Sequence, residues 1–254
     1  QNQLSAVDME TGALTILAKG HDFYSSPVIS PDGSRMAFMT WDHPNMPWDE
    51  STIWATGLDE AGLPREMVPV AGGKQGEQKI SVQQPQFSPT GELFYISDEG
   101  GSWNLYREQS SQGVCPRQAE FGGPHWVFGM HHYEFLDSSK IICCYSEKNL
   151  DRLALLDLDS GNLEDLDLPY TSIGNLSLSD NRLLTVVSSP KLFPEIIEIA
   201  LSTKRIRTIQ TSTDLELEDS YFSVPETIAF PTAGNAVSHG FYYPPTNKDF
   251  QGLD

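Results

Sequence analysis

The sequence carries little positive charge. Its 254 residues include 16 Lys and Arg against 35 Asp and Glu, which gives a net charge of -19. A chain of this charge repels phosphate backbones and anionic lipid, so we expect no nucleic-acid partner and no membrane partner. We interpret the excess of acid as a solvated surface rather than as a site for cationic partners.

Cysteines and long apolar runs are also scarce. The three cysteines, Cys115, Cys143 and Cys144, show no CxxC spacing and make no disulfide framework. They indicate structural thiols in a reducing compartment, and we expect a cytoplasmic protein. Cys143 and Cys144 are neighbours in an expected strand, so their side chains should point to opposite faces. No apolar run reaches the roughly 18 residues that a membrane-spanning helix needs.

One phrase occurs twice in the chain. Pro27-Val28-Ile29-Ser30-Pro31-Asp32-Gly33 recurs as Pro85-Gln86-Phe87-Ser88-Pro89-Thr90-Gly91, and each copy lies between two strand-like runs. Proline sets φ early in a tight turn, and the glycine takes the positive φ that closes it. The phrase therefore predicts a hairpin. A hairpin repeated at this spacing, with short strands and no helical pattern, is typical of a β-propeller.

The repeat predicts an all-β fold, a partial β-propeller of four-stranded antiparallel blades with about four and a half blades present. The propeller is expected over 1–218, and the blades over about 1–18 (partial), 23–72, 80–120, 126–169 and 172–212. The fourth strand of the second full blade is poorly marked, somewhere in 114–119. The segment Val7–Leu14 resembles Leu156–Leu163, so residues 1–18 are interpreted as the last two strands of a blade.

The pattern changes after about Leu217. Residues 223–230 and 236–245 form an expected strand pair around Pro231-Thr232-Ala233-Gly234-Asn235, which does not continue the blade phrase. We interpret 219–254 as the start of a second domain that is cut short. The chain also begins at Gln1, close to a strand pattern, so we expect further blades before it. An open propeller exposes strand edges, which favours homo-oligomers.

Several segments resemble the propeller of the prolyl oligopeptidase family of serine peptidases, in particular its dipeptidyl-aminopeptidase and acylaminoacyl-peptidase-like branch. They are Phe23–Pro27, Ser30–Gly33, Trp41–Asp49, Gln84–Pro89, Trp103–Arg107 and Trp126–Met130. The run Gly240–Pro245 is similar to the segment that leads into the α/β-hydrolase domain of that family. The Ser-Pro-Asp-Gly phrase alone occurs in many propellers. The run Trp41–Asp49, together with the terminal segment, makes the resemblance specific.

The resemblance implies a role in peptide hydrolysis. The family uses a Ser/Asp/His triad in its hydrolase domain, with the serine on a G-x-S-x-G turn. This chain has no G-x-S-x-G. We therefore expect no catalytic residue in it, and expect it to be the non-catalytic propeller part of a peptidase for short peptides, gating access to the substrate pocket and forming part of it. The implied partners are a peptide substrate and the α/β-hydrolase domain.

Two segments supply the candidate substrate-contact residues. The long loop Asp42–Thr52 and the preceding residue combine aromatic, amide and acidic side chains, and loops on a rigid scaffold are where binding residues gather. The second segment, His125–His132, is rich in aromatic residues. The alternative for both is packing against the chain itself or against a neighbouring domain. The candidates are Trp41, His43, Asn45, Met46, Trp48, Asp49, Trp126 and Phe128.

Metal and cofactor sites are not indicated. His131 and His132 are neighbours on an expected strand, so their side chains diverge and cannot share a metal ion. The acidic residues Asp157, Asp159, Asp165 and Asp167 lack the Gly and Glu of a calcium loop. Ser238-His239-Gly240 lies in an extended apolar run and is interpreted as a strand. We expect no cofactor.

Another class of protein stays open. A non-enzymatic propeller that binds proteins, like a Tol-type or WD-repeat module, explains the Ser-Pro-Asp-Gly turns equally well. It does not explain the strand pair at 223–245. A propeller glycosidase or lactonase would need inward carboxylates from several blades, which the pattern does not show.

Overall fold

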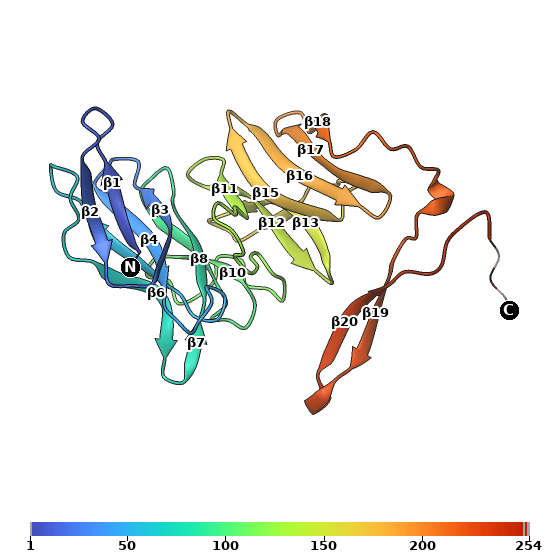
Figure 1. Ribbon diagram of the computed structural model, residues 1–254, viewed down its shortest axis with the longest axis horizontal. Coiled ribbons are helices and arrows are strands. Elements are labelled where there is room, and N and C mark those ends of the chain that lie inside the picture. The colour runs from blue at the N-terminus through green and yellow to red at the C-terminus, as the bar shows by residue number, and fades with distance from the viewer. Residues whose placement is uncertain (1, 251, 253–254) are drawn as a thin grey trace.

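The computed structural model describes residues 2–250 and residue 252. Strands dominate it: the described residues contain only two short 3-10 helices, η1 (Asp219–Tyr221) and η2 (Ala233–Asn235). In this part of the chain no helix is both long enough and apolar enough to span a membrane. Small antiparallel sheets follow one another in chain order, as Figure 1 shows from the blue end to the orange sheet. The predicted all-β partial propeller is confirmed.

A two-stranded sheet opens the chain, formed by β1 (Gln3–Val7) and β2 (Leu14–Lys19). Asp8 closes the turn between them, because its Oδ1 accepts hydrogen bonds from the backbone N–H and the hydroxyl of Thr11, at 2.7 and 2.8 Å. Asp157 makes the same pair of bonds with Ser160, at 2.9 and 2.7 Å. The similarity of these two turns, which the sequence predicts, is thus a shared hydrogen-bond pattern.

The next sheet has five strands rather than four. Its strands are β3 (Phe23–Ile29), β4 (Arg35–Trp41), β5 (Thr52–Gly57), β6 (Val68–Gln75) and β7 (Gln78–Ile80). The fifth strand, β7, carries the sheet past residue 72, the expected end of this blade, because the chain turns back at Gly76 and pairs again with β6.

The third sheet contains β8 (Val82–Phe87), β9 (Leu93–Ser97) and β10 (Asn104–Arg107). The prediction of a fourth strand within 114–119 is wrong. The segment follows β10 irregularly: Val114 N donates to Leu105 O at 2.7 Å, and Arg117 N donates to the side-chain Oδ1 of Asn104 at 3.1 Å. Pro116 has no N–H to give to a ladder, so the Asn104 side chain replaces backbone pairing here.

Two four-stranded sheets follow. One contains β11 (Tyr133–Phe135), β12 (Lys140–Glu147), β13 (Leu150–Asp157) and β14 (Leu163–Asp165). The other contains β15 (Ser172–Ser179), β16 (Arg182–Ser189), β17 (Leu192–Ala200) and β18 (Arg205–Thr211). The strand on which His131 and His132 are expected, β11, begins only at Tyr133. His131 and His132 therefore precede β11 rather than lying on it.

Side chains that alternate along each strand join neighbouring sheets. Cys143 packs in a buried cluster with Phe94 and Tyr133, between the third sheet and β11–β14. Cys144 packs with Ile173 and Ile197, between β11–β14 and β15–β18. The prediction that the two cysteines point to opposite faces is confirmed, and the core consists of such layers between successive sheets.

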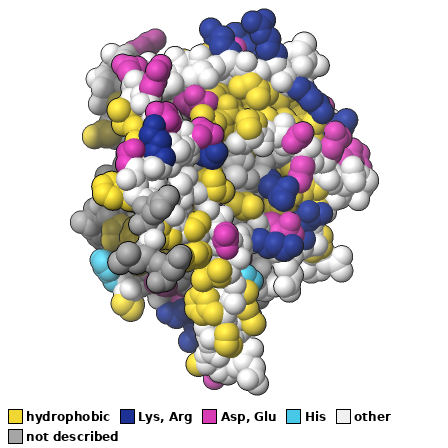
Figure 2. Space-filling model, turned by 90° about the vertical axis from the view of Figure 1, so that its right-hand side faces the viewer, with side chains coloured by type: hydrophobic (Ala, Val, Ile, Leu, Met, Phe, Trp, Pro, Cys, Tyr) yellow, Lys and Arg dark blue, Asp and Glu magenta, His cyan; other side chains and the backbone are white. Residues whose placement is uncertain are grey.

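The last sheet and a final hairpin expose apolar side chains. Leu184, Val186 and Ile196 on β16 and β17 are each at least 40% exposed. Figure 2 views the molecule from this side and shows yellow side chains among acidic and basic ones. The hairpin pairs β19 (Glu226–Pro231) with β20 (Val237–Tyr242), and the strand expected around His239 is confirmed.

Candidate functional site

The loop after β4 is fixed by its polar residues. Asp42 accepts hydrogen bonds from the His21 ring and from the backbone of Asp22, at 2.7 and 2.6 Å. Burial opposes ionisation of Asp42, but the His21 and Asp22 hydrogen bonds lower the pKa of this carboxyl overall. Further along, Asp49 accepts from Met46 N at 2.9 Å. Lys79 donates to Asn45 Oδ1 at 2.5 Å. Hydrogen bonds within the chain therefore fix the conformation of this loop.

The apolar residues of this loop face the segment His125–Phe128. Together they line a hollow of about 440 Å³. The Trp48 and Trp126 rings contact each other with their centroids 4.3 Å apart. On another wall the Phe23 ring stacks on Trp41 at 5.1 Å, with 10° between the ring planes. We call this the aromatic hollow; its lining is Phe23, Ser25, Met39, Trp41, Met46, Pro47, Trp48, His125, Trp126, Val127 and Phe128.

The candidate residues divide into two groups. Those that line the aromatic hollow are Trp41, Met46, Trp48, Trp126 and Phe128. His43, Asn45 and Asp49 do not line it. Asn45 and Asp49 stabilise the loop, and the ring of His43 lies edge-on to Phe23 at 5.0 Å. Whether any of these residues touches a substrate stays a prediction.

Sequence reasoning missed several lining residues. Phe23 is the clearest case, because it lies directly opposite Trp41 in the register of β3 and β4. Residues directly opposite each other on paired strands pack together, so aligning the two expected strands as a hairpin would have indicated Phe23. His125 and Val127 belong to the segment already chosen as a candidate. Met39 lies two residues before Trp41, on the same face of β4.

A second hollow, of about 520 Å³, lies along the first strands of successive sheets. Strand β3 contacts β8, and β11 contacts β15. Ser26 interrupts the pairing of β3 with β4, and Gln84 interrupts the pairing of β8 with β9, with positive φ values of 51° and 47°. Such bulges re-aim side chains. The lining includes Ser26, Gln84, Gln86 and His131, and we call it the polar hollow. It shares Ser25 and Phe128 with the aromatic hollow.

Gln84 ties β8 to β11. Its Nε2 donates to Tyr133 O at 2.7 Å, and its Oε1 accepts from His132 N at 2.6 Å. The Tyr133 hydroxyl donates to Gln84 O at 2.9 Å. Beside this network the His131 ring contacts Glu134 at 2.7 Å, and that hydrogen bond raises the pKa of His131. The polar hollow is thus lined by a connected set of polar groups.

Two histidines are held uncharged. The rings of His125 and His132 stack with centroids 6.0 Å apart. Burial, then the neighbouring histidines, lower the pKa of each to about 4. Neither Nε2 atom has a hydrogen-bond partner among the described residues. At neutral pH both rings are therefore neutral.

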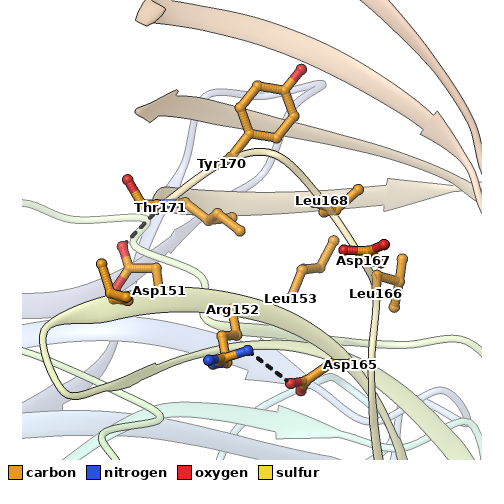
Figure 3. A pocket seen from close by; sticks show the side chains of 11 residues that line it. Asp151, Arg152, Leu153, Asp165, Leu166, Asp167, Leu168, Tyr170 and Thr171 are labelled. Atoms are coloured by element: carbon orange, nitrogen blue, oxygen red, sulfur yellow. Dashed lines mark hydrogen bonds and ion pairs between the residues drawn. The ribbon is translucent and has the colours of Figure 1, made fainter. Parts of the chain in front are cut away.

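A third cavity, of about 310 Å³, lies between β13, β14 and β15 (Figure 3). Arg152 pairs with Asp165 at 3.3 Å, and Asp151 Oδ2 accepts from Ile173 N at 3.0 Å. Burial raises the pKa of Asp151. The second contact joins the two sheets, so these polar groups serve structure. Residues 2–250 contain no group of three or more His, Cys, Asp or Glu side chains that could hold a metal ion.

Solved structures resemble this chain over nearly its whole length. A puromycin hydrolase is 29% identical with a TM-score of 0.84, and a puromycin-hydrolyzing peptidase from Mycobacterium tuberculosis is 26% identical with a TM-score of 0.86. Each match covers 96% of this chain and 37% of the other. Prolyl oligopeptidase B from Galerina marginata, 10% identical with a TM-score of 0.68, covers 94% and 34% and shows the fold alone. No family model matches the sequence, and no curated protein matches it.

The fold and these likenesses define a class, the partial β-propeller. Within that class the chain matches the propeller portion of a prolyl oligopeptidase-family peptidase. The resemblance found in the sequence is thereby confirmed. The chain spans 37% of the length of the two puromycin-hydrolysing proteins.

Proposed function

We propose that this chain is the non-catalytic propeller of a serine peptidase that hydrolyses short peptides, and that it restricts access to the active site and forms part of the substrate pocket. The observation that carries the proposal is the likeness to two puromycin-hydrolysing proteins, at 29% and 26% identity over 96% of the chain. Likeness at this level over 96% of the chain supports a common role for this propeller portion. That the substrate is a short peptide is also proposed.

The hollows support a role in substrate binding. The aromatic hollow has mostly apolar walls with few polar groups, as small-molecule sites do, and its volume lies in their range of roughly 300–1,000 Å³. It adjoins the polar hollow through Ser25 and Phe128, and the polar hollow lies along β3 and β8, the first strands of their sheets. A peptide bound there can contact both hollows at once.

In this proposal the chain contributes no catalytic group. The sequence has no G-x-S-x-G, so the nucleophile would belong to the α/β-hydrolase domain. We propose that 219–254 is the start of that domain. The β19–β20 hairpin fits this role, because all six residues of β19 are exposed and the hairpin pairs with none of the propeller sheets.

Fluorophosphonate labelling tests the proposal. The complete peptidase and this chain alone would be treated side by side, with heat-denatured samples as the control for nonspecific reaction. We expect specific labelling of the complete protein, reduced by a competing peptide, and none of this chain. Labelling of neither would overturn the peptidase proposal and favour a protein-interaction module of the Tol or WD-repeat type. Labelling of this chain, with triad-dependent peptide cleavage, would overturn its non-catalytic role.

A further inference from the structure

The aromatic hollow is formed in advance of binding. One wall belongs to β3 and β4, where Phe23 and Trp41 are stacked cross-strand neighbours. On the opposite wall, Trp48 of the loop after β4 contacts Trp126. The carbonyl of Pro47 accepts a hydrogen bond from Ser81, which anchors the loop to the chain between β7 and β8. A site held by rigid rings loses little side-chain entropy when a ligand enters.

No charged side chain lines this hollow. Its lining contains no Lys, Arg, Asp or Glu, and its hydrogen-bonding side chains, besides the indole groups of Trp41, Trp48 and Trp126, are Ser25 and His125. Burial lowers the pKa of His125 to about 4, so this ring is neutral at pH 7. An ionised side chain would lose water here without gaining an opposite charge, which is costly.

The arrangement of the rings also disfavours a cation cage. A cage for an ammonium group turns several ring faces toward one centre. Here the rings pair with each other, Phe23 on Trp41 and Trp48 against Trp126. Paired rings with free edges and outer faces suit a further ring, which can stack or meet them edge to face.

The adjoining polar hollow suits the main chain of a peptide. It shares Ser25 and Phe128 with the aromatic hollow, and its lining includes the side chains of Gln84, Gln86 and His131. A ligand spanning both hollows would present one apolar group and, next to it, hydrogen-bonding groups. A peptide with an aromatic residue has this composition.

Access to the aromatic hollow is open. Trp126, Val127 and Phe128 are 73%, 63% and 74% exposed. Their exposure also makes them suitable for substitution, because truncation removes little buried contact within the chain.

We propose that the aromatic hollow is a subsite for one uncharged aromatic side chain of the peptide substrate. This inference rests on the proposed peptidase function and adds to it a preference set by the propeller. Trp126 and Phe128 form the entrance of the subsite, and Trp41 and Trp48 form its walls.

The test uses the complete peptidase and short peptides in which one position at a time carries Phe, Ala, Lys or Glu. At one position we expect kcat/KM for Phe to exceed that for Ala by about 10- to 100-fold, as burial of one aromatic side chain would give. Lys and Glu should be no better than Ala. The Trp126→Ala and Phe128→Ala variants should each reduce the Phe-to-Ala ratio at that position, and Trp126→Phe should retain most of it.

The control is Met9→Ala, in the exposed turn between β1 and β2, where Met9 is 92% exposed. This variant should leave the Phe-to-Ala ratio unchanged. If Trp126→Ala lowers kcat/KM equally for every peptide, Trp126 only packs within the protein, and the inference is overturned. A preference for Lys over Phe would also overturn it. Cleavage without any aromatic preference would overturn the inference alone. Failure to cleave any peptide, with no fluorophosphonate labelling, would overturn the proposed function and the inference with it.

Discussion

Arg35 and Glu108 join two neighbouring sheets through one ion pair. Arg35 begins β4, Glu108 follows β10, and Arg35 Nη2 lies 2.7 and 3.0 Å from the two carboxylate oxygens. The pair is mostly shielded, with side chains 34% and 16% exposed. The guanidinium also lies over the Phe87 ring, 5.3 Å from its centroid. One side chain thus contributes a charged hydrogen bond and a cation–π contact to the packing of adjacent blades.

We predict that Arg35→Ala lowers the free energy of unfolding by about 1–3 kcal/mol, because it leaves Glu108 partly buried without a partner. Urea unfolding would measure the change. The control is Arg152→Ala, whose ion pair with Asp165 lies within one sheet and has side chains 45% and 39% exposed. It should cost less than about 1 kcal/mol. Equal losses in the two variants would contradict a special role for the Arg35 pair.

Two adjacent glutamines of β8 should respond oppositely to the same substitution. Gln84 is 4% exposed, and its amide satisfies Tyr133 O and His132 N. Gln83 is 2% exposed, and its amide has no hydrogen-bond partner among the described residues. Gln84→Met should cost about 2–4 kcal/mol, since it leaves two backbone groups unpaired.

Gln83→Met removes an unpaired buried amide at nearly constant volume, so stability should stay the same or rise. Thermal and urea unfolding of both variants would measure this difference. Both substitutions keep an unbranched side chain, so backbone preferences are matched. A large loss in Gln83→Met would mean that its amide has a polar partner in solution.

Much of the fold follows from local sequence. Ser30 and Ser88 begin the same turn, in which Gly33 N and Gly91 N each donate to the serine carbonyl at 2.9 Å. The two glycines take φ values of 72° and 87°, as the repeated phrase predicts. Turn chemistry of this kind is decided within a few residues, so a single sequence reveals it.

Other features of the fold and of the candidate site depend on contacts between residues that are distant in the sequence. The irregular path after β10 follows from the Asn104 side chain, which pairs with the backbone of Arg117 in place of a strand. The candidate residues came from two segments, and nothing local indicated that Trp48 meets Trp126. Ser26 and Gln84 adopt positive φ without being glycine, because the surrounding sheets fix them. Such features arise from tertiary packing.

All three thiols should be slow to react in the folded chain. Cys115, Cys143 and Cys144 are unpaired and at most 8% exposed. Burial raises the pKa of the Cys143 and Cys144 thiols, which suppresses the reactive thiolate. A thiol-specific disulfide reagent should modify the native chain far more slowly than the urea-unfolded chain, in which three thiols react. Rapid modification of one thiol in the native state would contradict the burial of that cysteine.

Acid should destabilise the chain through its buried histidines. Burial, then neighbouring histidines, lower the pKa of His125 and His132 from 6.5 to about 4, whereas in the unfolded chain they protonate near pH 6.5. The unfolded state therefore binds more protons between these values, and stability falls as pH drops from about 6.5 to 4. A shift of this size corresponds to roughly 3 kcal/mol per histidine.

His132→Gln should flatten the decline in urea-unfolding free energy between pH 6.5 and 4, because glutamine does not titrate. The matched control is His239→Gln on β20, an exposed position, which should leave the slope unchanged. His131 acts in the opposite sense: Glu134 raises its pKa, so its contribution is full below pH 6.5 and is lost as pH rises through the raised value. The contribution of His131 therefore changes mainly above pH 6.5, outside the range in which His125 and His132 lower the stability. An unchanged slope in His132→Gln would show that His132 is not held neutral in the folded protein.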